Sequence, residues 1–437
     1  MRIRDSIHSD RLPPSYYAAS SNYPDGFLRL EGNVRVDVCV VGGGYTGVAT
    51  ALALAEKGVS VALVEQNCIG WGASGRNGGQ IIGGFGPELS EFDNYQKTYG
   101  AAAETMWQAG VDCVDSVRSN VENYGIDCDL TWGYFDAAMN ERQMKDLAEA
   151  KMSLEQRGFP HAMKTISASD VGSVVGSKRF VGGLINEGWG HCHPLNLVRG
   201  EAKAAADSGV KIFEDARVSK LDYKKDSVVV DMDWGRVTAD KIVLACNAYL
   251  GTLVPKLANR MLPVGSYIIA TEALPDDLAA EILPGNHAVC DQRWALDYFR
   301  LSADKRLLFG GVATYSGMHP KDLVKKMRPK MLKVFPQLEA VKIDYQWGGY
   351  LAVGLNRIPQ IGRLDARTYY AQAYAGHGVA PSHGAAHMIA DAITGDDRRL
   401  AMIEAVKHRP FPGGRFLRKP MLATGMAFER FKELIGG

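Results

Sequence analysis

The strongest hydrophobic pattern in the chain lies at residues 35–65. Apolar side chains fill five of the seven positions 35–41, which predicts a parallel strand covered by helices on both faces. A run of glycines ends this strand, and apolar residues at helical spacing then predict a helix that stops at Gly58. The apolar stretch 59–64 predicts a second strand with Glu65 at its tip. This order is typical of a strand–helix–strand unit.

Helical spacing and strand alternation predict the remaining elements. Apolar residues recur at helical spacing over 88–124 and 141–157, whereas 129–139 alternates like a strand between them. Further helices are predicted over 195–208 and 379–394, and strands over 210–213, 216–221, 241–249, 267–271, 307–312 and 369–374. The mixture predicts an α/β fold, in which a discontinuous Rossmann-like domain carries an inserted substrate-binding domain with a mixed sheet.

The domain boundaries follow from these elements. Residues 1–33 are polar and rich in turn formers, so we expect an N-terminal arm anchored by Tyr16 and Tyr17; an arm that edges the entrance of the active site is the alternative. The dinucleotide-binding domain is predicted to comprise 34–89, 178–252 and 346–405, the substrate domain 90–177 and 253–345, and a C-terminal segment 406–437.

The glycines between the first strand and its helix point to a ligand. Gly42, Gly44 and Gly47 have the spacing G-x-G-x-x-G, which permits a tight turn, lets backbone N–H groups approach a pyrophosphate, and lets helix and strand pack closely. Glu65 can accept hydrogen bonds from both hydroxyls of an adenosine ribose, and its charge leaves no room for a 2′-phosphate. The unit therefore predicts a site for FAD or NAD, against the alternative of a glycine turn without a ligand.

A second glycine-rich loop favours FAD over NAD. Residues 70–80 contain five glycines in eleven residues and have almost no room for a regular element. Such a loop can wrap a diphosphate, with Ser74 and backbone amides as donors and Arg76 as a positive charge. Because NAD enzymes do not require a second loop of this kind, the sequence predicts a flavin site.

These motifs resemble the cofactor fingerprint of the glycine oxidase, sarcosine oxidase and D-amino-acid oxidase family of FAD-dependent amine oxidoreductases. Within that family, Ser-Tyr-Tyr-Ala-Ala-Ser at 15–20 and Pro-Phe-Pro-Gly-Gly-Arg-Phe at 410–416 look like the γ-glutamylputrescine oxidoreductase branch. Together, motifs and resemblance predict that FAD is bound by Gly42, Gly44, Tyr45, Thr46, Gly47, Glu65, Gln66, Ala73, Ser74, Arg76, Asn77, Gly78, Gly79, Gln80, Val218, Ala245, Asn247, Gly376, His377, Gly378 and Val379.

Four residues are candidates for the reaction itself: His377, Tyr267, Arg300 and Trp347. The resemblance implies a strand arginine that clamps a substrate carboxylate, a position that Arg300 matches approximately, and it places Trp347 near the flavin. The helix after His377 would direct its N-terminus at the pyrimidine edge of the flavin, where His377 would add positive charge. A structural histidine held by backbone groups is the alternative for His377.

The resemblance implies the reaction as well. We expect FAD-dependent oxidation of an amine C–N bond, with hydride transfer to flavin N5, hydrolysis of the imine to an aldehyde, and reoxidation by O2 with release of H2O2. The expected substrate is γ-glutamylputrescine or a related γ-glutamylated polyamine, in polyamine catabolism. An oxidase or dehydrogenase of a small N-methyl or D-amino acid, and a quinone-linked flavin dehydrogenase, stay open.

The substrate decides what Arg300 does. A small amino acid would place its carboxylate on the carbon that is oxidised, within reach of Arg300. A γ-glutamylated polyamine carries its carboxylate many bonds away, so that Arg300 would serve the structure or the channel wall. Aromatic residues such as Tyr267, Tyr298 and Trp347 would then line a tunnel for the alkyl stem. We favour this second case.

Composition adds limits on partners and location. Lys and Arg total 50 against 49 Asp and Glu, so no basic field indicates nucleic acid. Seven cysteines without paired spacing favour a reducing compartment, and no apolar run is long enough to span a membrane, so we expect a cytoplasmic protein. The segment 406–437 alternates basic and apolar residues; it either packs on its own domain or makes a peripheral membrane contact.

Two further predictions concern cofactor chemistry. Sarcosine oxidases tether the flavin through a cysteine in the C-terminal part of the chain, and here no cysteine follows Cys290, so we expect non-covalent FAD. His191, Cys192 and His193 could bind a metal, but no third ligand cluster is visible, so no metal site is predicted.

Overall fold

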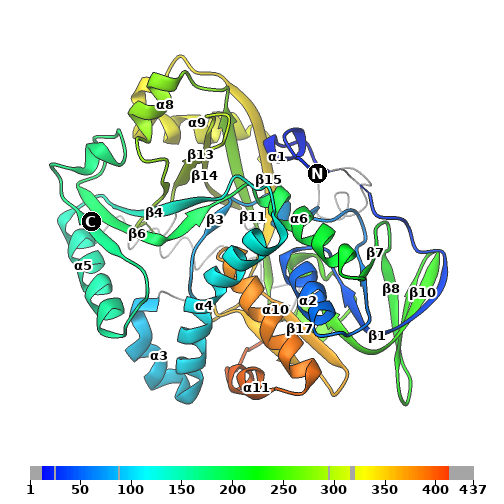
Figure 1. Ribbon diagram of the computed structural model, residues 1–437. Helices are drawn as coiled ribbons and strands as arrows, with labels where there is room; N and C mark the ends of the chain where they lie inside the picture. Colours follow the sequence, from blue (N-terminus) through cyan, green and yellow to red (C-terminus); the bar gives the residue numbers. More distant parts are fainter. Residues whose placement is uncertain (1–11, 24–25, 87–88, 294–295, 315–319, 413–437) are drawn as a thin grey trace.

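The computed structural model describes residues 12–23, 26–86, 89–293, 296–314 and 320–412, and these form two sheets with helices around them (Figure 1). The first sheet has eight strands: β1 (Gly32–Val41), β2 (Val61–Val64), β7 (Lys211–Phe213), β8 (Val218–Tyr223), β9 (Val228–Met232), β10 (Gly235–Leu244), β16 (Gln360–Arg363) and β17 (Thr368–Gln372). Its central strands β17, β10, β1, β2 and β7 are parallel, and β8 and β9 form an antiparallel pair beside β10.

The predicted strand–helix–strand unit is confirmed as β1, α2 (Tyr45–Glu56) and β2. All four residues of β2 and the last four of β1 are buried, as expected for strands between two layers of helices or loops. Four helices lie together beside this sheet in Figure 1: α2, α4 (Ala101–Tyr124), α6 (Pro194–Asp207) and α10 (Val379–Thr394). Their apolar faces form the largest core of the protein with β1 and β2.

The second sheet has nine strands and is mixed. They are β3 (Gln80–Ile81), β4 (Thr131–Ala138), β5 (Met163–Ile166), β6 (Gly182–His191), β11 (Leu262–Thr271), β12 (Ala288–Asp291), β13 (Tyr298–Leu301), β14 (Leu307–Thr314) and β15 (Ile343–Val353). Only the contact between β12 and β4 is parallel among the pairs of this sheet in the described residues. One face packs on α8 (Asp276–Ile282) and α9 (Leu323–Val334), where Phe299, Phe309 and Met327 fill a second core.

The remaining helices are short or peripheral. They are α1 (Tyr16–Ala19), α3 (Phe92–Tyr99), α5 (Glu141–Gln156), α7 (Pro255–Ala258) and α11 (Arg398–Glu404). The stretch predicted as one or two helices over 88–124 contains α3 and α4, which part at Gly100, where φ is +55°. Within the described ranges, no helix combines the length and the apolar character that a membrane span requires.

The N-terminal arm is anchored as expected. Tyr17 is fully buried, and the hydroxyl of Tyr16 donates to Oδ1 of Asp304 at 2.7 Å. Neither tyrosine lines the large cavity described below, so the contacts of this part of the arm are those of an anchor.

The assignment of strands to sheets differs from the expected division of the chain. The strand β6 and most of β15 fall in segments predicted for the dinucleotide-binding domain, yet both belong to the nine-stranded sheet. The helix α4, predicted for the substrate domain, packs on α10. The domain boundaries stay a prediction. Most of the C-terminal segment lies outside the described residues; Phe411 is buried against Leu262 and Val264.

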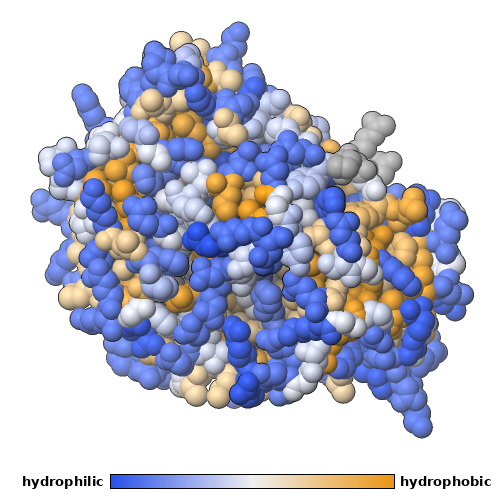
Figure 2. Space-filling view, viewed as in Figure 1, coloured by the Kyte–Doolittle hydropathy of each residue, from blue (hydrophilic) through white to orange (hydrophobic). Residues whose placement is uncertain are grey.

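Figure 2 shows the outer surface from the same side as Figure 1. Hydrophilic residues cover much of this face, and hydrophobic residues gather at the right, over the region of β8 and β10 in Figure 1. Among the exposed apolar side chains of the described residues, Leu28 is 84% and Trp234 61% accessible.

Candidate cofactor and substrate site

A cavity of about 2120 Å³ is lined by residues of both sheets. Its lining begins at the glycine turn after β1 and includes the ends of β2 and β10, the loop 71–80, and the turn before α10. It continues along β4, β11, β12 and β13 of the second sheet. A cavity of this size and shape can hold a dinucleotide together with a substrate.

The glycine turn forms the cradle that its spacing predicts. Gly42 has φ +114°, and a Cβ at this position would lie 2.8 Å from the carbonyl oxygen of Ala245. A Cβ at Gly47 would lie 1.8 Å from the carbonyl oxygen of Gly42. Only glycine permits this approach of turn and helix. The helix α2 begins after Gly44, which supplies no side-chain cap, and the amide of Tyr45 donates to Oγ of Ser74 at 2.9 Å, so Ser74 stands at this helix N-terminus, where an anion can bind.

Glu65 stands at the end of β2 and lines the cavity. Its Oε2 accepts from the amide of Gly43 at 2.7 Å, and its Oε1 accepts from the amide of Asn67 at 3.0 Å. Burial raises the pKa of Glu65, and these amide hydrogen bonds oppose the rise. Each carboxylate oxygen keeps a further lone pair, so Glu65 can still accept from ribose hydroxyls.

The second glycine loop presents an unneutralised cation to the cavity. Arg76 stacks on Trp71, with the guanidinium carbon 4.2 Å from the ring centroid, and its Nη1 donates to the carbonyl of Gly348 at 3.3 Å. Its Nε and Nη2 are buried without a hydrogen-bond acceptor among the described residues. Burial lowers the pKa of Arg76. Orphaned guanidinium donors beside a glycine cradle fit the diphosphate of FAD.

Nearly all predicted cofactor-binding residues line this cavity; the exceptions are Gly47 and Gly79. Gly79 has φ +74°, and a Cβ there would lie 2.2 Å from the carbonyl oxygen of Cys192, so it serves close packing, as Gly47 does. Sequence reasoning missed Gly43, Arg217, Lys220, Cys246 and Tyr249, which also line the cavity. All five are within two residues of a predicted cofactor-binding residue, so their neighbourhood in the sequence was a signal that could have found them.

Arg300 does not line the cavity, which agrees with the favoured interpretation of Arg300 as a structural residue and not with the alternative of a carboxylate clamp. It is 3% exposed, and its guanidinium is occupied by internal acceptors. Nε donates to the carbonyl of Gly78 at 2.7 Å, Nη2 to the carbonyl of Cys192 at 2.7 Å and to the hydroxyl of Tyr17 at 3.2 Å, and Nη1 to Leu301 at 3.0 Å. Arg300 therefore joins the glycine loop, the turn before α6 and the N-terminal arm.

Tyr267 and Trp347 are also outside the cavity lining, contrary to their expected place in a tunnel. Tyr267 packs in the second core and its hydroxyl lies 2.9 Å from Oγ1 of Thr314, whereas its neighbours Ser266 and Ile268 line the cavity. Successive strand residues point to opposite faces, and Tyr267 takes the core face. Trp347 is 5% exposed and donates from Nε1 to the carbonyl of Arg76 at 3.0 Å, so it supports the glycine loop from behind.

His377 lines the cavity with Gly376, Gly378 and Val379, at the start of α10. Its Nε2 lies 2.9 Å from the carbonyl oxygen of Ile82, an acceptor, so Nε2 carries the hydrogen. Burial lowers the pKa of His377, and the hydrogen bond to Ile82 only partly opposes this. The ring is therefore neutral at pH 7, and the positive charge expected there comes from the N-terminus of α10 alone.

An apolar and aromatic stretch lies along the second sheet. Tyr134 and Cys290 form a small buried cluster with partly buried Ile82, Trp189 and Tyr298, and all five line the cavity. The hydroxyl of Tyr298 lies 3.5 Å from Oγ of Ser266, and burial raises the pKa of Tyr298 to about 12. Tyr298 is thus the one member of the predicted aromatic set that the structure places in the cavity lining.

The His-Cys-His motif serves structure in the described residues. His191 contacts the carbonyl oxygen of Asn286 at 2.8 Å through Nε2, whereas Nδ1 of His193 accepts from the amide of Asn196 at 3.1 Å and caps α6. Burial lowers the pKa of each to about 3. No group of three or more His, Cys, Asp or Glu side chains within the described ranges is arranged to hold a metal ion.

Comparisons with known proteins identify a family of FAD-dependent enzymes and a similar enzyme. Residues 37–392 match the family model described as FAD dependent oxidoreductase. The chain is 42% identical over 424 residues to the gamma-glutamylputrescine oxidoreductase of Escherichia coli K12, covering 97% of this chain and 98% of that protein.

Two solved structures show the same fold. Glycine oxidase from Geobacillus kaustophilus superposes with a TM-score of 0.71 at 21% identity, covering 86% of this chain and 100% of that one. L-proline dehydrogenase from P. horikoshii gives a TM-score of 0.71 at 20% identity, covering 85% and 96%. The predicted fold class is confirmed by these superpositions, which at such identities speak for the fold alone.

Proposed function

The chain belongs to the family of FAD dependent oxidoreductases, and we propose that it acts on amines and oxidises the terminal C–N bond of γ-glutamylputrescine or of a related γ-glutamylated polyamine. The observation that carries this proposal is the 42% identity to the Escherichia coli enzyme over nearly the full length of both chains. The expected cofactor is FAD, as the family description states.

The residues of the cavity fit FAD and suggest how it would be held. The glycine turn and the N-terminus of α2 would take the diphosphate, Arg76 would neutralise it, and Glu65 would hold the ribose. Bound there, FAD would supply a two-electron acceptor for the hydride on the carbon that bears the amine. The overall reaction that we propose converts the amine, O2 and water into an aldehyde, ammonia and H2O2.

The chain contributes position and a dry environment to this chemistry. Tyr134, Trp189 and Tyr298 offer apolar faces along which an alkyl stem can lie, and their bulk excludes water from it. The hydroxyl of Tyr298 keeps its proton at neutral pH and can orient the amine by hydrogen bonding together with Ser266. The ammonium of the substrate can give its proton to bulk water before the amine enters the cavity, so no proton transfer by Tyr298 is needed.

The position of Arg300 supports a long substrate over a small amino acid. A small amino acid carries its carboxylate on the carbon that is oxidised, and a clamp for that group must face the cavity. Arg300, the strand arginine at the expected position, instead donates hydrogen bonds to backbone carbonyls and to the hydroxyl of Tyr17. The carboxylate of a γ-glutamyl group would have to be bound elsewhere.

Kinetics of the purified holoenzyme test this proposal. Under anaerobic conditions, γ-glutamylputrescine should bleach the flavin, and kcat/KM for it should exceed the values for sarcosine and glycine. If kcat/KM for sarcosine or glycine equals or exceeds the value for γ-glutamylputrescine, the proposed substrate is wrong. Oxygen uptake with stoichiometric H2O2 identifies the acceptor as O2, whereas turnover that needs an added quinone would replace that part of the proposal.

A further inference from the structure

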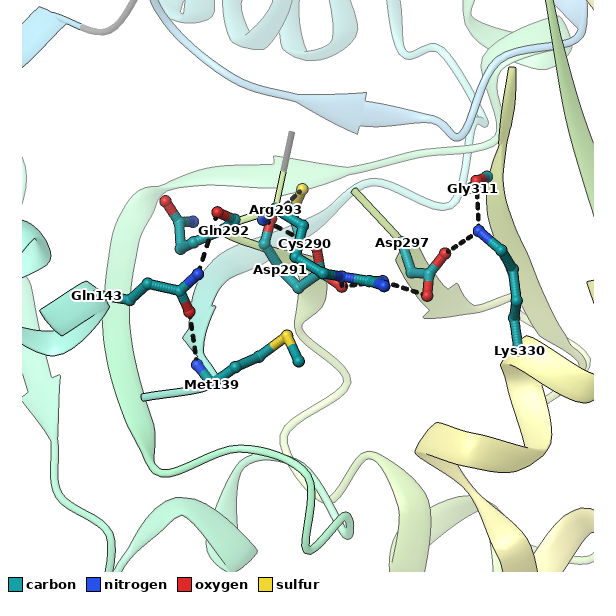
Figure 3. A network of polar contacts seen from close by, with 9 residues as sticks. All are labelled: Met139, Gln143, Cys290, Asp291, Gln292, Arg293, Asp297, Gly311 and Lys330. Atoms are coloured by element: carbon teal, nitrogen blue, oxygen red, sulfur yellow. Dashed lines mark hydrogen bonds and ion pairs between the residues drawn. The ribbon is translucent and has the colours of Figure 1, made fainter. Parts of the chain in front are cut away.

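A network of charged side chains lines the cavity on the second sheet (Figure 3). Arg293 lies between Asp291, which ends β12, and Asp297, which precedes β13, and Lys330 of α9 lies beyond Asp297. We call these four residues the charged shelf. Arg293 donates from Nε to Oδ2 of Asp291 at 2.8 Å and from Nη2 to Oδ2 of Asp297. Lys330 donates from Nζ to Oδ1 of Asp297 at 3.3 Å and to the carbonyl of Gly311 at 3.0 Å.

The shelf exposes its cations to the cavity more than its carboxylates, although Asp291 is also part of the lining. The side chains of Asp291 and Asp297 are only 1% and 2% exposed, whereas those of Arg293 and Lys330 are 29% and 35% exposed and line the cavity. The buried carboxylates therefore hold the two cations in place from behind. A guanidinium has five N–H donors and an ammonium has three, so both cations retain donors for an anionic ligand.

Two glycines of β14 fix the shelf next to the aromatic stretch. A Cβ at Gly310 would lie 2.1 Å from Cζ of Tyr298, and a Cβ at Gly311 would lie 2.2 Å from Oδ1 of Asp297. Because both positions lack a side chain, Tyr298 and Asp297 pack flat on β14 as consecutive residues. Tyr298 in turn contacts Gly78 of the cofactor loop, where a Cβ would lie 2.7 Å from its ring. The shelf is thus separated from the cofactor loop by one aromatic side chain.

Hydrogen bonds from β4 and its neighbours support the peptide of the shelf. Asp136 of β4 pairs with Cys290 in the sheet, lines the cavity, and accepts from Nε2 of Gln292 at 2.8 Å. The carbonyl of Gln292 accepts from Gln143, whose own Oε1 accepts from the amide of Met139 at 2.8 Å (Figure 3). This chain of hydrogen bonds holds the peptide that leads from Asp291 to Arg293.

We propose that the charged shelf binds the α-amino-acid group at the far end of the substrate through Arg293 and Lys330, which take its carboxylate. The inference rests on the proposed function and names the part of the site that selects γ-glutamyl amines. Two carboxylates and two cations make the shelf neutral, so a zwitterionic group adds no net charge to it. In γ-glutamylputrescine, about nine bonds, roughly 11 Å when extended, separate the reacting nitrogen from the α-carbon. An amine of that length can lie along Tyr298 and reach the shelf, whereas a small amino acid cannot do both.

The test compares two substrates in matched variants of the holoenzyme. One substrate is γ-glutamylputrescine, and the other is its α-carboxamide, in which the free carboxylate is a neutral amide. Lys330→Met should lower kcat/KM for γ-glutamylputrescine by about tenfold or more, mainly through KM, and should change the value for the α-carboxamide less than about twofold. Lys330→Arg should restore most of the loss. Lys326→Met, an exposed lysine of the same helix that does not line the cavity, is the control and should change neither value.

The unmodified enzyme gives an independent reading. It should prefer γ-glutamylputrescine over the α-carboxamide by about tenfold or more in kcat/KM. Equal values for the two substrates, or an equal loss for both in Lys330→Met, would overturn the shelf as carboxylate site. Failure of the unmodified enzyme to oxidise either γ-glutamylated amine would instead overturn the proposed function, so the two failures are distinguishable.

Discussion

At the scale of single residues, Arg300 shows how a charged side chain can hold a site together without entering it. Its guanidinium joins the carbonyls of Gly78 and Cys192 and the hydroxyl of Tyr17, which come from three separate parts of the chain. A buried cation is stabilised here by backbone dipoles.

Arg300→Ala should therefore destabilise the protein rather than weaken substrate binding selectively. The change leaves several buried acceptors without donors, at a cost of about 1–3 kcal/mol each. We expect a clearly lower midpoint in thermal unfolding of the holoenzyme, while KM of the folded fraction changes less than about threefold. Arg300→Lys keeps the charge but not the planar set of guanidinium donors, so its unfolding midpoint should lie between those of the unmodified protein and Arg300→Ala. A large rise in KM with an unchanged unfolding midpoint would show instead that Arg300 binds the carboxylate of the substrate.

Glu65 gives a second prediction at this scale. Glu65→Gln keeps the shape of the side chain but replaces a carboxylate oxygen by a donor, which cannot accept from a ribose hydroxyl or from the amide of Gly43. A hydrogen bond to a charged group contributes about 1.5–3 kcal/mol, so the Kd for FAD should rise at least about tenfold. Titration of the apoprotein with FAD, followed by flavin fluorescence, measures it. An unchanged Kd would place the ribose acceptor elsewhere.

The cofactor residues were predictable because their signals are local. Gly42, Gly44 and Glu65 belong to one strand–helix–strand unit, so spacing alone sets their geometry. The orientation of Tyr267 is not local: β11 is flanked by β14 and β15, and its register with β14 shifts between Tyr267 and Ile268. The pairing of three distant segments thus decides which face is core, and no pattern within β11 contains that information.

At the scale of elements, a buried ion pair ties together the helices that stand behind the cavity. His383 of α10 contacts Oε1 of Glu201 of α6 at 2.7 Å through Nε2, and the carbonyl oxygen of Val379 at 2.7 Å through Nδ1. The same Oε1 accepts from Asn120 of α4 at 2.8 Å, and Tyr45 of α2 packs beside the His383 ring. Both nitrogens of His383 face acceptors, so the ring is held as an imidazolium.

This pair predicts a dependence of stability on pH. Burial lowers the pKa of His383, but the charge and hydrogen bonds of Glu201 and Val379 outweigh it, so the pKa lies above the usual 6.5. A raised folded-state pKa contributes stability that is complete below pH 6.5 and is lost as pH rises through the folded value. Between pH 6 and pH 9, the unfolding midpoint should therefore fall more in the natural protein than in a His383→Gln, Glu201→Gln double variant. Parallel curves for the two proteins would contradict the imidazolium.

The elements themselves were largely predictable, and their assembly was not. The helices α5, α6 and α10 begin within one residue of their predicted starts, because caps and helical spacing are properties of the segment. The sheet that a strand joins depends instead on which distant strands lie beside it after the chain has folded. The strand β6 follows β5 of the second sheet after the connection 167–181 and leads into α6, which packs on α2 beside the first sheet, so its place in the chain is compatible with either sheet.

At the scale of the whole molecule, the cavity brings two cysteines near the expected cofactor, which bears on how FAD is held. Cys246 and Cys290 line the cavity. Burial raises the pKa of Cys246 to about 12 and raises that of Cys290 well above its usual value, so both are thiols rather than nucleophilic thiolates at neutral pH. Acid precipitation of the holoenzyme should leave a colourless pellet and a yellow supernatant. A yellow pellet would show a covalent link, which Cys246→Ala and Cys290→Ala would then locate.

The N-terminal arm connects the second sheet with the start of α6, which packs on α2 beside the first sheet, so its removal should lower the stability of the protein. Tyr17 packs at 5.2 Å on the ring of Trp347, from β15, and at 5.0 Å on His193, which caps α6, while Tyr16 is bonded to Asp304 between β13 and β14. Loss of one fully buried aromatic side chain costs about 3–5 kcal/mol.

A chain that lacks residues 2–20 should therefore unfold at a lower temperature and release FAD more readily on dilution. The matched control lacks only residues 2–11 and retains each of these contacts, so its unfolding midpoint and flavin retention should equal those of the full chain. Because Tyr17 also accepts a hydrogen bond from Arg300, the effects of Tyr17→Ala and Arg300→Ala should not add in the double variant. Additive effects, or equal stability of the two shortened chains, would show that the arm covers the surface without joining the second sheet to α6.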